Sequence, residues 1–133
     1  MLGTISQAAV LAFRHGLICM VTSRSGRRWV LPKGQIELHQ SPREAALAEA
    51  WEEAGLLGRV DSEPLGRYSY EKNEMLHEVS VYRMTVTTER AEWPEKNQRL
   101  REWVTIEEAM LRIEEDELRE LLPLLIAGES RSS

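Results

Sequence analysis

The chain has 133 residues, of which 42% are hydrophobic and 29% charged, and its formal net charge at pH 7 is −5. This length and composition are typical of one globular domain with a sizeable core, and they exclude a largely disordered chain. The acidic balance argues against nonspecific nucleic-acid binding, because that affinity comes from cationic side chains placed on phosphates.

Cysteine usage and apolar runs bear on the cellular compartment. Cys19 is the single cysteine, which excludes an internal disulfide and suits a reducing compartment. No apolar run approaches the roughly 20 residues of a membrane-spanning helix, and residues 1–6 lack the basic start of a signal peptide. We therefore expect a cytoplasmic protein without membrane attachment, forming a single domain over residues 1–133 with a flexible polar tail at 128–133.

Short apolar runs, partly alternating with polar residues and bounded by turn residues, predict strands in the first third and the middle of the chain. The expected strands are residues 7–13, 17–21, 29–31, 59–70 with a break near Pro64, 77–88 and 100–104. Arg14-His15-Gly16 predicts a tight turn between the first two strands. Residues 22–28 and 33–40 are expected to be loops.

The clearest predicted helix covers residues 41–54. Ser41 is an N-cap candidate, Pro42 suits the first helical position, and Glu44 would complete a capping box. Gly55 supplies the left-handed residue that ends such a helix. Two further helices are expected at 106–113, capped by Thr105, and at 116–127. Strands interspersed with helices predict a mixed sheet with helices on its faces, an α/β or α+β fold.

The helix at 41–54 carries three carboxylates at helical spacing. Glu49, Glu52 and Glu53 are i, i+3 and i+4, which predicts one shared face. The residues expected on the opposite, apolar face are Leu47, Ala50, Trp51 and Ala54. Three close carboxylates repel one another, and a divalent cation such as Mg²⁺ offsets that repulsion directly. Without further support, however, such a pattern is more typical of a solvated acidic face.

The segment before this helix favours a ligand site. Pro32-Lys33-Gly34 follows a predicted strand and leads toward the capped helix. A glycine lets the backbone approach a metal or a phosphate closely, and Lys33 can offer a positive charge to a phosphate. The order of strand, glycine loop and helix would put these groups beside the carboxylates.

Residues 34–56 resemble the Nudix box, which is G, five residues, E, seven residues, then R-E-U-x-E-E-x-G-U with U aliphatic. The residues in register are Gly34, Glu49, Glu52, Glu53, Gly55 and Leu56. Two positions depart, because Gln40 replaces the first glutamate and Ala48 replaces the arginine. The resemblance implies the α/β/α sandwich of Nudix hydrolases, a mixed β-sheet with helices on both faces.

The resemblance also implies a metal site and a mechanism. Glu49, Glu52, Glu53 and the Gly34 carbonyl would bind Mg²⁺, with Mn²⁺ as the alternative. Glu52 or Glu53 would be the catalytic base that takes a proton from the attacking water. The motif arginine normally orients a helix glutamate, so Ala48 is expected to affect the rate more than the fold.

The flanking residues suggest a branch of the family. Ser23-Arg24 and residues 28–34 look like the approach to the box in diphosphoinositol polyphosphate phosphohydrolases and their bacterial relatives. By this likeness Arg24, Arg28 and Lys33 would bind the substrate. The expected reaction is hydrolysis of a phosphoanhydride bond in a nucleoside-diphosphate-linked, diphosphoinositol polyphosphate or dinucleoside polyphosphate substrate, which would be the small polyphosphorylated partner.

Two alternatives remain beside this hypothesis. One is removal of pyrophosphate from RNA 5′ ends, against which the acidic net charge and the lack of a basic stripe count. The other is a noncatalytic ligand sensor on the same fold, motivated by Gln40 and Ala48. The scattered His15, His39 and His77 are expected to have no catalytic role.

Overall fold

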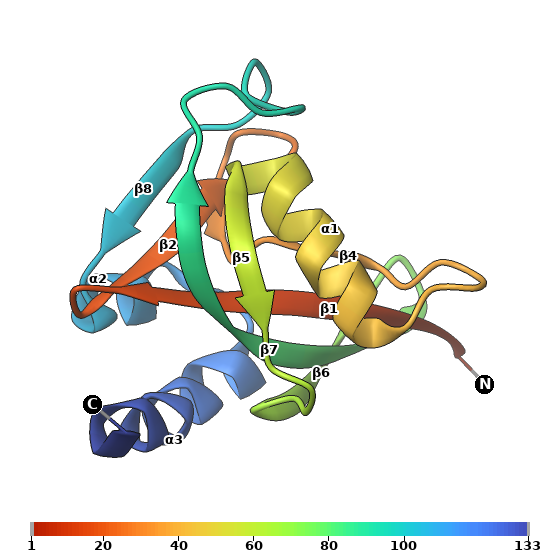
Figure 1. Cartoon of the computed structure of the whole chain (residues 1–133). Coiled ribbons are helices and arrows are strands. Elements are labelled where there is room, and N and C mark those ends of the chain that lie inside the picture. The colour runs from red at the N-terminus through yellow and green to blue at the C-terminus, as the bar shows by residue number, and fades with distance from the viewer. Residues whose placement is uncertain (1, 133) are drawn as a thin grey trace.

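The computed structural model describes the backbone of residues 2–132 and the side chains of residues 2–127. Within these residues, eight strands form one sheet: β1 (Gly3–Arg14), β2 (Leu17–Thr22), β3 (Trp29–Val30), β4 (Lys33–Gln35), β5 (Leu56–Val60), β6 (Gly66–Lys72), β7 (Met75–Glu89) and β8 (Arg101–Val104). The helices are α1 (Pro42–Ala54), α2 (Ile106–Arg112) and α3 (Asp116–Ser132). Figure 1 shows α1 on one side of the sheet and α2 and α3 on the other.

The sheet is mixed, with β1 at its branch point. β1 runs parallel to β7 along one edge, while its other edge pairs antiparallel with β4 near Gln7 and with β2 near Phe13. The strand order is β3-β2-β1-β7-β5, with β6 also on β7 and β8 also on β2. β2 and β4 therefore pair with the same edge of β1 at two separate places and diverge from there. Residues 23–32 connect them along the chain.

The two faces of the sheet bury two separate cores, which confirms the predicted sandwich. β1 supplies Ala8, Val10 and Ala12 to one core and Ala9 and Leu11 to the other, as a strand buried on both faces must. This double burial explains why the sequence there is a continuous apolar run. The α1 residues in the first core are all small: Ala45, Ala46, Ala50 and Ala54. Leu47, expected in the apolar stripe, is instead 40% exposed.

Helix boundaries follow their local signals. The Ser41 hydroxyl accepts from the Glu44 N–H, the Glu44 carboxylate accepts from the Ser41 N–H, and Gly55 has φ 68°. Both ends of the predicted helix are thereby confirmed. Thr105 caps α2 in the same way, accepting from the Glu108 N–H. Such caps depend on neighbours in sequence, which is why a single sequence predicts them well.

One sequence expectation needs correction. Residues 33–35, predicted to be loop, form β4, because their backbone pairs with Gln7–Ala9 of β1. The break predicted near Pro64 in the strand at 59–70 is confirmed, because residues 61–65 separate β5 from β6, which pair with different parts of β7. The α3 backbone continues through Ser132. Of the tail predicted at 128–133, the side chains and Ser133 lie outside the described residues, and its flexibility stays a prediction.

No helix among the described residues is long and apolar enough to cross a membrane. Cys19 lies fully buried in the core beneath α1, and burial raises the pKa of its thiol to about 12. The predicted cytoplasmic location and single-domain organisation stay predictions.

Candidate active site

The three helix glutamates do not share one environment. Glu53 is only 6% exposed, Glu49 is half-buried and Glu52 is exposed. The buried pair faces β4, where the Lys33 N–H donates to Glu53 Oε1 at 3.2 Å. A side chain at Gly34 would collide with the Glu49 carboxyl, so glycine is required for this approach. α1 and β4 thus bring two carboxyls and a glycine backbone together.

Electrostatics make this carboxyl pair receptive to a cation. Burial and the hydrogen bond with Glu49 raise the pKa of Glu53 to about 8, and burial likewise raises the pKa of Glu49. Two carboxyls held together away from water favour either a shared proton or a bound cation. Within residues 2–127 no group of three or more His, Cys, Asp or Glu side chains is arranged to hold a metal. The pair still fits Mg²⁺, which takes oxygen ligands and keeps several waters.

Arg99 is a site residue that the sequence did not reveal. Its side chain is 6% exposed and its Nη2 lies 3.4 Å from Glu53 Oε2. Nε donates to Glu95 Oε1 at 2.8 Å and Nη1 donates to the Thr22 carbonyl at 2.9 Å. Arg99 therefore clamps Glu53 from outside α1.

Trp93 holds the same loop against the end of α1. Its Nε1 donates to the Glu53 carbonyl at 2.9 Å, and the Glu95 N–H donates to the Glu52 carbonyl at 3.0 Å. Trp93 therefore anchors this loop to α1. The carbonyls at the end of α1 are thereby paired with the loop that carries Arg99.

A cavity of about 540 Å³ opens beside Glu53, close to where β2 and β4 diverge. The cations that line it include Arg24, Arg28 and Lys33, which were predicted to bind substrate. Lys72 and Arg99 line it as well and were not predicted. Such a concentration of positive charge in an acidic protein suits a polyanionic ligand.

One wall of the cavity is aromatic. Tyr70 stacks on His77 with ring centroids 4.6 Å apart, and Lys33 Nζ lies 4.5 Å from the Tyr70 ring centroid. The Tyr70 hydroxyl donates to Gln7 Oε1 at 2.8 Å. His77 Nδ1 is the buried side-chain polar atom without a hydrogen-bond partner among residues 2–127. His77, expected to have no catalytic role, therefore lines the candidate site.

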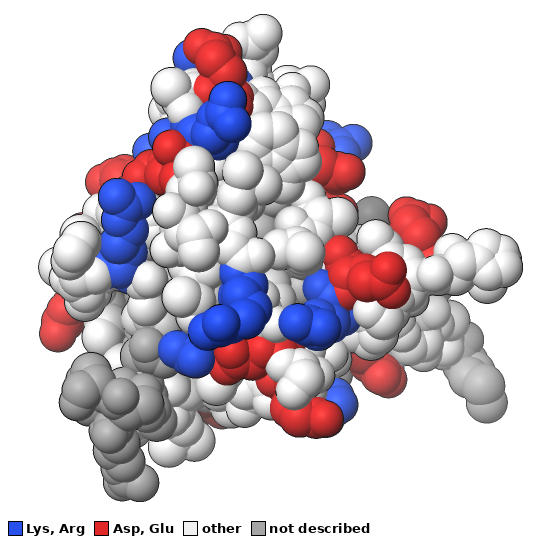
Figure 2. Space-filling view, viewed as in Figure 1, with Lys and Arg blue, Asp and Glu red and all other residues white. Residues whose placement is uncertain are grey.

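The face of the molecule seen in Figure 2 shows no comparable concentration of positive charge. There, basic and acidic side chains stand in small separate groups beside broad uncharged areas. A nucleic-acid groove would need a continuous basic stripe.

The Nudix domain family model matches residues 4–125. The chain belongs to the Nudix family. This membership confirms the family resemblance of residues 34–56, and the fold comparison below confirms the predicted sandwich.

Several Nudix relatives are similar over most of this chain. Nudix hydrolase 21, chloroplastic, from Arabidopsis thaliana is 33% identical over 85% of this chain and 60% of its own length. Diphosphoinositol polyphosphate phosphohydrolase 3-beta from Bos taurus is 34% identical over 81% of this chain and 68% of its own. The chain spans about half of Nudix hydrolase 4 from Arabidopsis thaliana, 45% of that protein.

Solved structures show the same Nudix fold. An Ap4A hydrolase from C. elegans, solved as a binary complex, matches with a TM-score of 0.80 at 16% identity, covering 97% of this chain and 99% of that one. At this identity the likeness establishes the fold alone.

The two departures from the Nudix box lie together. Gln40 and Ala48 both line a surface hollow of about 590 Å³ that shares no lining residue with the cavity beside Glu53. Gln40 Oε1 accepts the Glu37 N–H at 3.0 Å, so the amide stabilises the loop before α1.

Proposed function

We propose that the chain is a Mg²⁺-dependent hydrolase that cleaves a phosphoanhydride bond in a small polyphosphorylated substrate. The carrying observation is the juxtaposition of a buried carboxyl pair, Glu49 and Glu53, with a cavity that gathers Arg28, Lys33 and Arg24. Metal ligands and phosphate-binding cations are what such a reaction needs in one place.

Glu49, Glu53 and the Gly34 carbonyl would hold the metal, with Glu52 at the exposed edge of the same helix. All are oxygen donors, which suits Mg²⁺ and also Mn²⁺. When bound, the metal neutralises phosphate charge and lowers the pKa of a coordinated water.

The chain's own groups supply position, charge and a base. Glu53 is the stronger candidate base, because its carboxyl is buried beside the cavity and held by Arg99, whereas Glu52 is exposed. Arg99 holds that carboxylate in place at 3.4 Å. Arg24, Arg28 and Lys33 would bind the phosphate oxygens and balance the charge that develops as the leaving group departs.

For the substrate, we propose a diphosphoinositol polyphosphate or a dinucleoside polyphosphate. The similarity to a protein named diphosphoinositol polyphosphate phosphohydrolase supports this choice, as does the concentration of cations around the cavity. Removal of pyrophosphate from RNA remains the second candidate, and the formal net charge of −5 does not favour it.

The test is phosphate release from the purified protein with Mg²⁺. The panel contains diphosphoinositol polyphosphates, dinucleoside polyphosphates, nucleoside triphosphates and 5′-triphosphate RNA. We expect turnover that is lost in EDTA and falls about 100-fold or more in Glu53→Gln, as for loss of a general base. The matched control is Glu63→Gln, the same change at an exposed residue, which should leave the rate unchanged. Full activity of Glu53→Gln would contradict the mechanism, and binding without turnover would favour the ligand sensor.

A further inference from the structure

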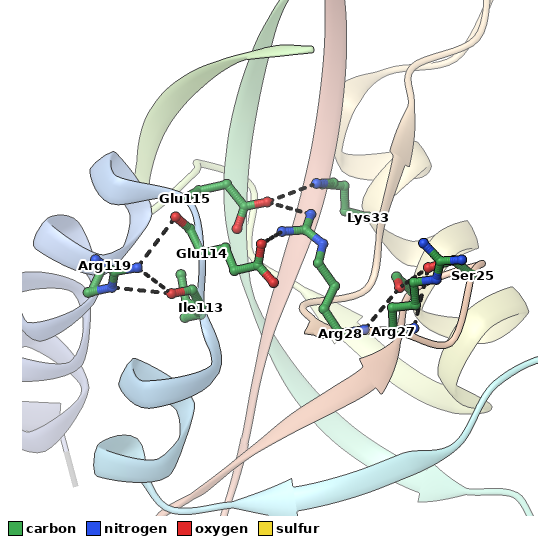
Figure 3. A network of polar contacts seen from close by, with 9 residues as sticks. Ser25, Arg27, Arg28, Lys33, Ile113, Glu114, Glu115 and Arg119 are labelled. Atoms are coloured by element: carbon green, nitrogen blue, oxygen red, sulfur yellow. Dashed lines mark hydrogen bonds and ion pairs between the residues drawn. The ribbon is translucent and has the colours of Figure 1, made fainter. Parts of the chain in front are cut away.

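Two of the cations proposed to bind phosphate already hold an anion from the protein itself. Glu115 Oε2 lies 2.8 Å from Arg28 Nη2 and 3.8 Å from Lys33 Nζ. Figure 3 shows the Glu115 carboxylate reaching both cations from the connection between α2 and α3. Its side chain is 9% exposed, so water screens these contacts little.

The corner that carries Glu115 is braced. Arg119 Nη2 and Nε donate to the Ile113 carbonyl at 2.7 and 3.2 Å, and the Arg119 N–H donates to the Glu115 carbonyl at 3.0 Å. Burial alone would raise the pKa of Glu115, but the hydrogen bond from Arg28 and the charge of Lys33 outweigh it and lower that pKa. The carboxylate is thus held in place and ionised at neutral pH.

Glu115 lies close to where two neighbouring hollows of the surface meet. The cavity of about 540 Å³ adjoins a hollow of about 410 Å³, and Arg28, Tyr70 and Lys72 line both. Glu115 lines the second hollow but not the first. A phosphate chain that advances from the cavity toward Arg28 therefore meets a like charge.

Arg99, one of the five cations lining the cavity, is paired with Glu53 and Glu95, and the other four fall into two groups. Arg28 and Lys33 are compensated by Glu115, whereas Arg24 and Lys72 make no ion pair within residues 2–127. The uncompensated cations are free to take the first phosphates of a ligand. Further phosphates gain from Arg28 and Lys33 only by replacing the carboxylate.

We propose that Glu115 is a specificity-determining residue: its carboxylate occupies the anion position of Arg28 and Lys33, so a ligand must carry enough phosphate charge to displace it. This inference rests on the proposed function only in assigning a phosphate chain to the cavity. By this arrangement the site discriminates against short, weakly charged phosphates, which is specificity through an opposing element.

The test is calorimetric titration of the full chain with inorganic tripolyphosphate in the absence of Mg²⁺. We expect Glu115→Gln to bind about tenfold more tightly than the unmodified chain and to show a steeper salt dependence, since a competing charge is gone. Glu114→Gln is the matched control, because Glu114 lies 3.7 Å from Arg28 but is 65% exposed. Its affinity should change less than about twofold.

Unchanged or weaker binding in Glu115→Gln would overturn the proposal and make Glu115 a brace for Arg28. Glu115→Ala removes the same carboxylate by a different change and should also bind more tightly, which keeps the test usable if the amide variant folds poorly. With a hydrolysed substrate, Glu115→Gln should lower KM and leave kcat within about threefold. The binding arm needs no turnover, so an inactive protein would contradict the proposed function and leave this test intact.

Discussion

The two sides of α1 differ in which charged side chains they carry and in how far those side chains are buried. On one side Glu49 and Glu53 are withdrawn from water against β4, and Arg99 reaches Glu53 from a distant loop. On the other, Gln40 and Ala48 line an open hollow where the Nudix box has a glutamate and an arginine. Glu49 and Glu53 therefore lie where burial strengthens their interactions, whereas a charge at position 40 or 48 would be screened by water.

This contrast bears on whether the departures mark lost activity. The hollow with Gln40 and Ala48 shares no residue with the cavity beside Glu53. The orientation of Glu53 depends on Arg99, which lies outside the motif. The departures at Gln40 and Ala48 therefore leave the arrangement around Glu53 in place.

The largest effect on stability is expected from Arg99→Met. The substitution leaves Glu53 and Glu95 without their buried cation and the Thr22 carbonyl without its donor. We expect the free energy of unfolding to fall by about 3 kcal/mol, as for a broken buried ion pair. Urea denaturation measures it. Lys96→Met removes an exposed pair with Glu92 and should cost less than about 1 kcal/mol; equal losses would show that Arg99 has no special role.

Gly34→Ala should weaken the carboxyl pair next. The added methyl would collide with the Glu49 carboxyl, so either that carboxyl or β4 must move. We expect weaker Mg²⁺ binding in calorimetry as the main effect, and only a modest loss of stability, because the carboxyl is the end of a flexible side chain that can turn away. Gly3→Ala is the control, since a methyl there would also meet only the end of a flexible side chain, that of Met75 at 2.9 Å, and no glutamate. Mg²⁺ affinity that is the same in Gly34→Ala and the unmodified chain would remove Gly34 from the proposed metal site.

The metal-free protein should lose stability as the pH rises. The pKa of Glu53 is raised from 4.5 to about 8 in the folded chain, so the folded state holds this proton more tightly than the unfolded state. Its contribution is fully present below pH 4.5 and is lost as the pH rises through about 8. Thermal unfolding in EDTA between pH 5 and 9 measures the loss. Glu53→Gln should flatten the profile, and Mg²⁺ should oppose the loss; an identical slope in the variant would assign it to other groups.

The smallest effect is expected on the other side of α1. Restoring the motif with Gln40→Glu and Ala48→Arg adds a pair at a hollow open to solvent, which should change stability by less than about 1 kcal/mol. We expect turnover to change less than in Arg99→Met. A large gain in kcat from the double variant would instead show that the motif pair acts on the catalytic side.

The sequence by itself determined what depends on neighbours along the chain. Ser41, Glu44 and Gly55 mark both ends of α1 because capping contacts span only a few residues. The spacing of Glu49 and Glu53 likewise placed both carboxyls on a single helix and identified the family motif.

Contacts between distant segments were decided only by the tertiary structure. Residues 33–35 became β4 through pairing with β1, Arg99 met Glu53 across the fold, and Glu115 met Arg28. The shared face predicted for three glutamates divided into buried and exposed members because β4 covers only part of α1. Burial decides how strongly each of these charged groups interacts with its neighbours. It depends on how distant segments pack together and not on the spacing of residues along one segment.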